Sequence, residues 1–143
     1  MKPFWDFSLA LYARPGIAPA CLTLQDSHGQ DVNLLLFCCW VGEPLTAAAL
    51  AEADALVAPW RTQVVQPLRA VRRWLKTRDE PLRQAVAAQE LAAEQRQQAM
   101  LHAWAMARWP GAGRTPGRHA AANLALLTQA PESRLLAEAA QFP

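Results

Sequence analysis

The apolar run over residues 34–41, preceded by an acid and an amide in "DVNLLLFCCW", most constrains the fold. A helix that crosses a bilayer needs about 20 apolar residues, so this run is far too short to span a membrane. Asp31 is a good N-cap for a helix over residues 32–41, and Gly42 and Pro44 end that helix. A short helix that is apolar around most of its circumference is predicted to lie at the centre of a core.

The composition favours helices over strands. Alanine and leucine dominate the hydrophobic residues, which make up 52% of the 143, whereas Val, Ile, Thr, Tyr and Phe are scarce. The chain is long enough for one domain with a substantial core. We therefore predict an all-α, single-domain helical bundle.

Prolines and glycines divide the chain into helices. A first helix is expected to end at the "RPG" turn, and a second, over residues 17–27, forms an αα-hairpin with the central helix. A fourth helical region begins at Thr46 and meets Pro59 and Pro67, which predicts a kink or short break within a basic helix. An Ala/Gln-rich helix is expected from about residue 82 to residue 109.

The domain boundaries follow from the same signals. We expect a helical bundle domain over residues 1–109, a Pro/Gly linker over 110–118, and short helices over 119–143 that either dock on the bundle or remain mobile. The polar middle of the long helix, "EQRQQ", is expected to project or to pair with another copy, so a homodimer through this helix is one hypothesis.

The most directional charge lies on the proline-kinked helix. The net charge of +2 alone does not imply a polyanion partner, but residues 61–83 hold seven basic against two acidic residues, a local +5. Such a surface can bind an acidic protein or nucleic acid, stay solvated, or pair with acids of the same chain. The candidate binding residues are Arg61, Arg69, Arg72, Arg73, Lys76, Trp60 and Trp74.

A polar cluster near the hairpin gives a second candidate site. Asp26, Asp31 and Asn33 are hypothesised to line a polar pocket with the arginines of the basic helix. The hairpin register places Asp26 level with Asn33. The structural alternative is that these side chains satisfy backbone donors at turns and helix starts.

The three cysteines favour packing over metal binding. Cys38 and Cys39 point about 100° apart on a helix, and the spacing to Cys21 does not match paired zinc ligands. An odd number of cysteines without a CxxC motif is typical of reduced cytosolic thiols. Cys21 and Cys38 are the one pair that we propose testing for a redox role.

Catalytic motifs are absent from the sequence. There is no GxSxG, GxGxxG, P-loop or HExxH pattern, so we assign no catalytic residue, metal or cofactor. The patterns lean toward a non-enzymatic protein.

The motifs "FWDFSLALYARPG", "ACLTLQD" and "DVNLLLFCCW", followed by "APWRTQVVQPLRAVRRWLK", resemble a family of proteobacterial conserved hypothetical proteins with a domain of unknown function. The resemblance covers roughly residues 4 to 78. It implies a bacterial cytosolic protein and brings no activity, cofactor or catalytic residue.

Three functions remain open from the sequence. The first is a small cytoplasmic interaction or adaptor protein, without a membrane partner, that contacts another protein through the basic helix and tryptophans. The second is a ligand-binding or enzymatic protein with an inter-helix Asp/Asn/Arg pocket. The third is nucleic-acid binding through the basic helix.

Overall fold

The central helix α3 (Val32–Trp40) is enclosed by the rest of the molecule, and its side chains from Asn33 to Trp40 are all buried. The structure, a computed structural model, describes residues 3–141. As predicted, Asp31 caps this helix, because its Oδ1 accepts a hydrogen bond from the Asn33 amide at 2.9 Å. Phe4 stacks on Trp40 with ring centroids 5.1 Å apart, which fixes the first helix against the third.

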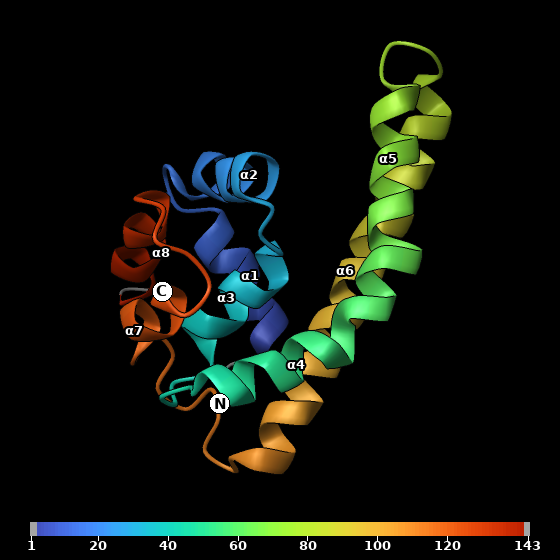
Figure 1. Cartoon of the computed structure of the whole chain (residues 1–143). Coiled ribbons are helices and arrows are strands. Elements are labelled where there is room, and N and C mark those ends of the chain that lie inside the picture. The colour runs from blue at the N-terminus through green and yellow to red at the C-terminus, as the bar shows by residue number, and fades with distance from the viewer. Residues whose placement is uncertain (1–2, 142–143) are drawn as a thin grey trace.

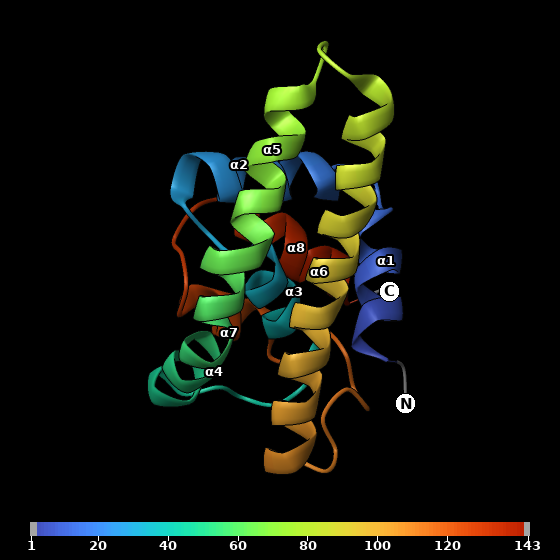
Figure 2. The same ribbon diagram turned by 90° about the vertical axis from the view of Figure 1, so that its right-hand side faces the viewer.

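Helices from both ends of the chain surround α3. α1 (Phe4–Tyr12) lies beside it, and α2 (Ile17–His28) crosses the end of the pair, as Figure 2 shows. α7 (Ala120–Ala125) and α8 (Glu132–Ala140) pack on α3 and α2, where Leu124 and Leu136 join the core. We call α1, α2, α3, α7 and α8 the body. Of the two alternatives for the C-terminal helices, the structure has α7 and α8 docked on the bundle.

The prolines in the fourth helical region produce a π-helical turn. α4 (Ala47–Trp60) continues without a break through η1 (Arg61–Val65) into α5 (Gln66–Leu75). The Gln66 amide donates to the Arg61 carbonyl, which is five residues back and not the four of an α-helix. The next residue, Pro67, has no amide to donate. The expected kink or break is therefore a local change of helical pitch.

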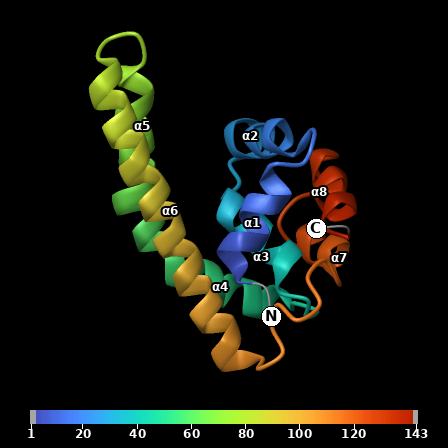
Figure 3. The same cartoon turned by 180° about the vertical axis from the view of Figure 1, so that it is seen from behind.

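The long helix α6 (Glu80–Arg108) returns antiparallel to α5. Together α5 and residues 80–94 of α6 form a hairpin that projects beyond the body, which we call the arm (Figure 1). Figure 3 shows α6 running from the tip of the arm to the base of the molecule. The Trp60 indole nitrogen, at the end of α4, donates to the Ala93 carbonyl at 2.8 Å and ties α4 to α6 at the base of the arm.

The polar middle of α6 packs against the body, whereas the sequence predicted that it projects or pairs with another copy. Gln97 and Gln98 are buried against the body instead of projecting from it. Burial is tolerated because each amide finds hydrogen-bond partners on α1 or α3 or beside them. The all-α, single-domain architecture is confirmed, with no strand among residues 3–141.

Candidate functional site

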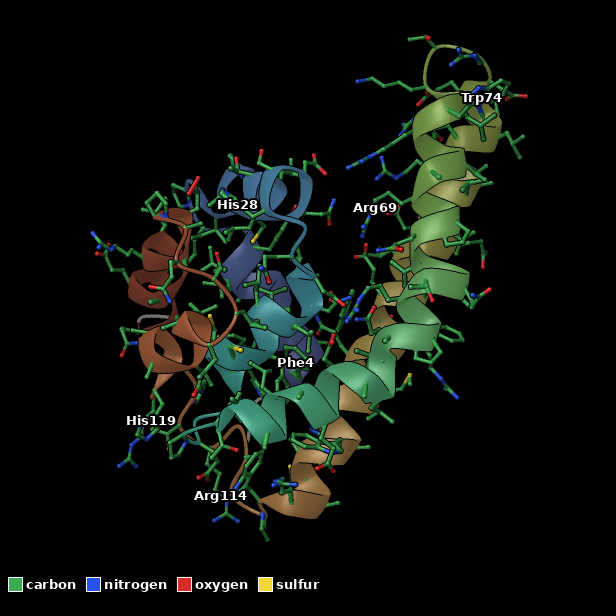
Figure 4. All side chains as sticks on the ribbon, in the orientation of Figure 1. Phe4, His28, Arg69, Trp74, Arg114 and His119 are labelled. Atoms are coloured by element: carbon green, nitrogen blue, oxygen red, sulfur yellow. The ribbon has the colours of Figure 1, made fainter. Side chains whose placement is uncertain are left out.

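A cleft of about 990 Å³ separates the arm from the body. Its body wall comes from α1, α2, the start of α3 and the segment after α7, and its arm wall comes from η1, α5 and α6. In Figure 4 the Arg69 side chain points from the arm toward this space. The cleft therefore exists because the hairpin leaves the body at the π-helical turn.

The floor of the cleft contains an ion pair between the start of α3, in the body, and η1, at the base of the arm. Arg61 Nε donates to Asp31 Oδ2 at 2.6 Å, and a second nitrogen of Arg61 donates to Asp54. The Asp31 and Arg61 side chains are only 10% and 18% exposed, so their attraction is weakly screened. Gln97 also donates to Asp31 Oδ2 at 2.6 Å, which gives this carboxylate bonds to α3, η1 and α6 at once.

A chain of amides continues from this ion pair into the core. Asn33 Nδ2 donates to Gln97 Oε1 at 3.2 Å, and Gln98 Nε2 donates to Asn33 Oδ1 at 3.0 Å. The Ser8 hydroxyl on α1 then donates to Gln98 Oε1 at 3.1 Å. The polar groups of the floor bond one another, so their role is to hold the floor of the cleft in place.

The arm wall contains a second set of ion pairs. Glu90 is buried and accepts hydrogen bonds from Arg69 Nε at 3.1 Å and from Arg72. Arg69 also reaches Glu94 Oε1 at 3.3 Å. Burial, with the nearby charge of Glu90, raises the pKa of Glu94. Across the cleft, burial raises the pKa of Tyr12, and the charge of Glu94 adds to this rise.

One exposed ion pair bridges the mouth of the cleft. Arg73 on the arm donates to Asp26 Oδ1 on α2 at 3.0 Å, and about half of each side chain is exposed. The hydrogen bond from Arg73 lowers the pKa of Asp26. An exposed pair of this kind contributes little stability, so it can separate when the cleft is filled.

Exposed apolar side chains also line the walls of the cleft. Among residues 3–141, half of the large hydrophobic side chains that are exposed line this cleft. They are Leu9, Tyr12, Leu22, Leu91 and Leu126. Exposed apolar surface that is concentrated in a concavity is typical of a binding site.

The predicted site residues divide into two groups. Asp26, Asp31, Asn33, Arg61, Arg69 and Arg73 all contribute to the cleft. Arg72 is bonded to Glu90, Trp60 is bonded to Ala93, and Trp74 lies at the tip of the arm with Lys76 following it in the chain. The hairpin register placed Asp26 level with Asn33, but Asp26 bonds Arg73 and Asn33 bonds the α6 glutamines.

Sequence reasoning missed the residues that α6 contributes. Glu94, Gln97 and Gln98 lie in the "EQRQQ" stretch, which the sequence predicted to project or to pair with another copy, and the buried Glu90 one turn before it was not singled out. The available signal was their helical spacing, because positions 90, 94, 97 and 98 share one face of a helix.

The cysteines lie in the core away from this surface. Cys21, Cys38 and Cys39 are free thiols with no exposed surface. Burial raises the pKa of Cys21 and of Cys38 to about 12, and raises that of Cys39 well above its usual value. The redox role of Cys21 and Cys38 stays a hypothesis. No cluster of three or more metal-ligating side chains occurs in the described part of the chain.

The fold and the cleft define a single-domain, all-α protein with a projecting helical arm and an inter-helix cleft. The chain belongs to the family described as "Protein of unknown function (DUF2390)", whose model matches residues 3–101. The resemblance to a family of unknown function is thus confirmed, and the match extends into α6. All cleft residues except Leu126 and Leu127 lie within it. The proteobacterial origin stays a prediction.

The other comparisons found no match. Neither a curated protein nor a solved structure matches the chain. Over residues 3–141, none of the helices combines the length and the apolar character needed to cross a bilayer.

Proposed function

We propose that this protein is a binding protein that holds the apolar part of a ligand in the cleft between arm and body. The observation that carries the proposal is the concentration of exposed apolar side chains on both walls of one concavity. A volume of about 990 Å³ is at the upper end of the range that ligand pockets occupy.

The charged groups of the cleft support a binding role. Arg61 and Arg69 are already held by carboxylates, so they position the walls. The apolar side chains have no such partner, and covering them would remove apolar surface from water. The adaptor hypothesis of the sequence also needed Arg69, Arg72 and Trp60 as contact residues, and their intramolecular bonds weaken that alternative.

The test uses an apolar fluorescent probe, 8-anilinonaphthalene-1-sulfonate, with the full chain. We expect saturable binding to one site, and a loss of affinity of about tenfold or more when Leu9→Asp and Leu91→Asp are combined, one on each wall. The matched control combines Leu56→Asp with Leu135→Asp, which are exposed leucines outside the cleft.

The variants must remain folded for the comparison to count. Near-ultraviolet circular dichroism checks this directly, since molten states also bind the probe. Equal loss of probe binding in the cleft and control variants, or no saturable binding by the parent protein, would overturn the proposal.

A further inference from the structure

The tip of the arm presents a tryptophan whose side chain is mostly exposed to solvent. Trp74 is 61% exposed, more than any other large hydrophobic side chain in the described residues. The Arg78 guanidinium lies 4.5 Å from the centroid of its ring and so covers one face of it, while most of the side chain is exposed. Figure 4 shows Trp74 at the end of the arm that is farthest from the body. We call Trp74, Lys76 and Arg78 the arm tip.

The backbone of the turn places the cation over the ring. Thr77 adopts a left-handed conformation with φ of 66°, which is unusual for a β-branched residue. The chain then turns back, so that the Arg78 amide bonds the Leu75 carbonyl at 2.9 Å and the Arg78 side chain bonds the Trp74 carbonyl at 2.5 Å. Strain of this kind persists only where the surrounding structure fixes it.

The cations of the arm tip differ from the others on the arm. Arg72 is neutralised by Glu90 and Arg83 by Glu80. Within residues 3–141, Lys76 and Arg78 form no ion pair with a carboxylate, and both are exposed. The acid beside them, Asp79, accepts a hydrogen bond from the Leu82 amide at 3.0 Å, because it caps α6. Lys76 and Arg78 outweigh the single negative charge of Asp79, so the arm tip has a net positive charge.

From this geometry we propose that the arm tip binds single-stranded nucleic acid. One base stacks on the open face of Trp74, while phosphates contact Lys76, Arg78 and, after release from Asp26, Arg73. A cationic surface beside an aromatic ring is the arrangement that binds single strands without regard to sequence. The site is distinct from the cleft walls except at Arg73.

Size argues for a strand over a folded protein partner. A stable protein interface buries about 1,200 Å² or more in total, which needs a broad surface. The end of a two-helix hairpin is narrow, whereas a single-strand site can be as short as about 4 nucleotides.

The test is fluorescence anisotropy of a labelled oligouridine of about 12 nucleotides, titrated with the full chain. We expect saturable binding. A plot of the logarithm of the binding constant against the logarithm of the salt concentration should have a slope of about −2, since three phosphate contacts are made. Trp74→Ala should weaken binding about tenfold, whereas Trp74→Phe should retain most of it because a ring remains.

A charge-matched pair of variants separates the arm tip from the general charge of the protein. Lys76→Glu with Arg78→Glu should abolish binding. Arg118→Glu with Arg134→Glu changes the net charge equally at exposed positions near α7 and on α8, and should leave affinity unchanged.

Three outcomes would overturn the proposal. The parent protein binds no oligouridine at low salt, the control pair loses as much affinity as the arm-tip pair, or polyglutamate or anionic vesicles bind the arm tip as tightly as oligouridine does. The last outcome would identify an acidic protein or a lipid surface as the partner. Circular dichroism of each variant ensures that lost binding reflects the altered surface.

Discussion

Asp31 and Arg61, thirty residues apart in the sequence, form the ion pair that joins the body to the base of the arm at 2.6 Å. The same carboxylate caps α3 and accepts a hydrogen bond from Gln97. Asp31 is therefore one of the side chains that position the arm and set the width of the cleft.

Asp31→Ala should therefore lower the free energy of unfolding by about 3 kcal/mol or more, because it removes a helix cap and leaves the guanidinium of Arg61 partly buried. Asp31→Asn should lose less, since its amide oxygen still caps α3. Urea denaturation measures both. The control is Asp54→Ala, which removes the more exposed partner of Arg61 and should cost less than about 1 kcal/mol. Equal losses for Asp31→Ala and Asp54→Ala would contradict this account.

Asn123 holds α7 to the centre of the molecule. Its Oδ1 accepts from the Leu45 amide at 2.9 Å, and its Nδ2 donates to the carbonyls of Cys38 and Glu43. Asn123→Ala leaves these buried groups unsatisfied and is expected to lower the free energy of unfolding by about 3 kcal/mol. Gln129→Ala, which removes an exposed hydrogen bond to Ala125, should change it by about 0.5 kcal/mol at most. Chemical denaturation midpoints that agree for the two variants would argue against docked C-terminal helices.

Two left-handed glycines differ in the space around them. A Cβ on Gly113 would lie 2.3 Å from Trp40 Cζ2, whereas a Cβ on Gly16 would meet nothing within 4 Å. Gly16→Ala should cost about 1 kcal/mol from its backbone conformation alone. Gly113→Ala adds a clash with the largest core side chain and should cost about 3 kcal/mol or more. Thermal unfolding compares them, and a smaller loss for Gly113→Ala than for Gly16→Ala would refute the packing described at Trp40.

Glu94 makes stability depend on pH. Its pKa in the folded protein lies above its ordinary value of 4.5, mainly because it is buried. The folded state therefore binds the proton more tightly than the unfolded state does. The charged carboxylate thus lowers stability at neutral pH, and this loss disappears as the pH falls through the raised pKa.

Glu94→Gln should then be more stable than the parent at pH 7, and the difference should vanish below about pH 4. Urea titrations at both pH values measure this. Glu90→Gln is the control and should be less stable at pH 7, because Glu90 accepts hydrogen bonds from Arg69 and Arg72. A Glu94→Gln variant that is less stable than the parent at pH 7 would show that the bond to Arg69 outweighs burial.

The three cysteines should be inert in the folded protein. The thiolate is the reactive form, and burial holds the pKa of Cys21 and Cys38 near 12. Ellman's reagent at pH 8 is expected to react only at the rate of unfolding, and with all three thiols in urea. Rapid reaction of two thiols, together with a mass loss of two hydrogens under mild oxidant, would instead support the redox pair of Cys21 and Cys38.

The helices could be predicted from the sequence because their signals are local. Asp31 and Thr46 cap helices at the predicted positions, and the apolar run after Asp31 lies buried as α3. These features depend on neighbours within one or two helical turns, where backbone geometry decides which groups meet.

The cleft depended on contacts that only the tertiary structure decides. The sequence placed Asp31, Asn33 and Arg61 in a candidate pocket. Gln97 and Gln98, which bond Asp31 and Asn33, lie 64 to 66 residues further along the chain. They were predicted to project or to pair with another copy. A glutamine has the same local preference whether it faces water or a buried carboxylate, and only the packing of α6 against α1 and α3 distinguishes the two. The sequence by itself determined where the helices begin and which of them is most apolar. The tertiary structure decided which charges neutralise one another, and it left Trp74, Lys76 and Arg78 exposed at the end of the arm.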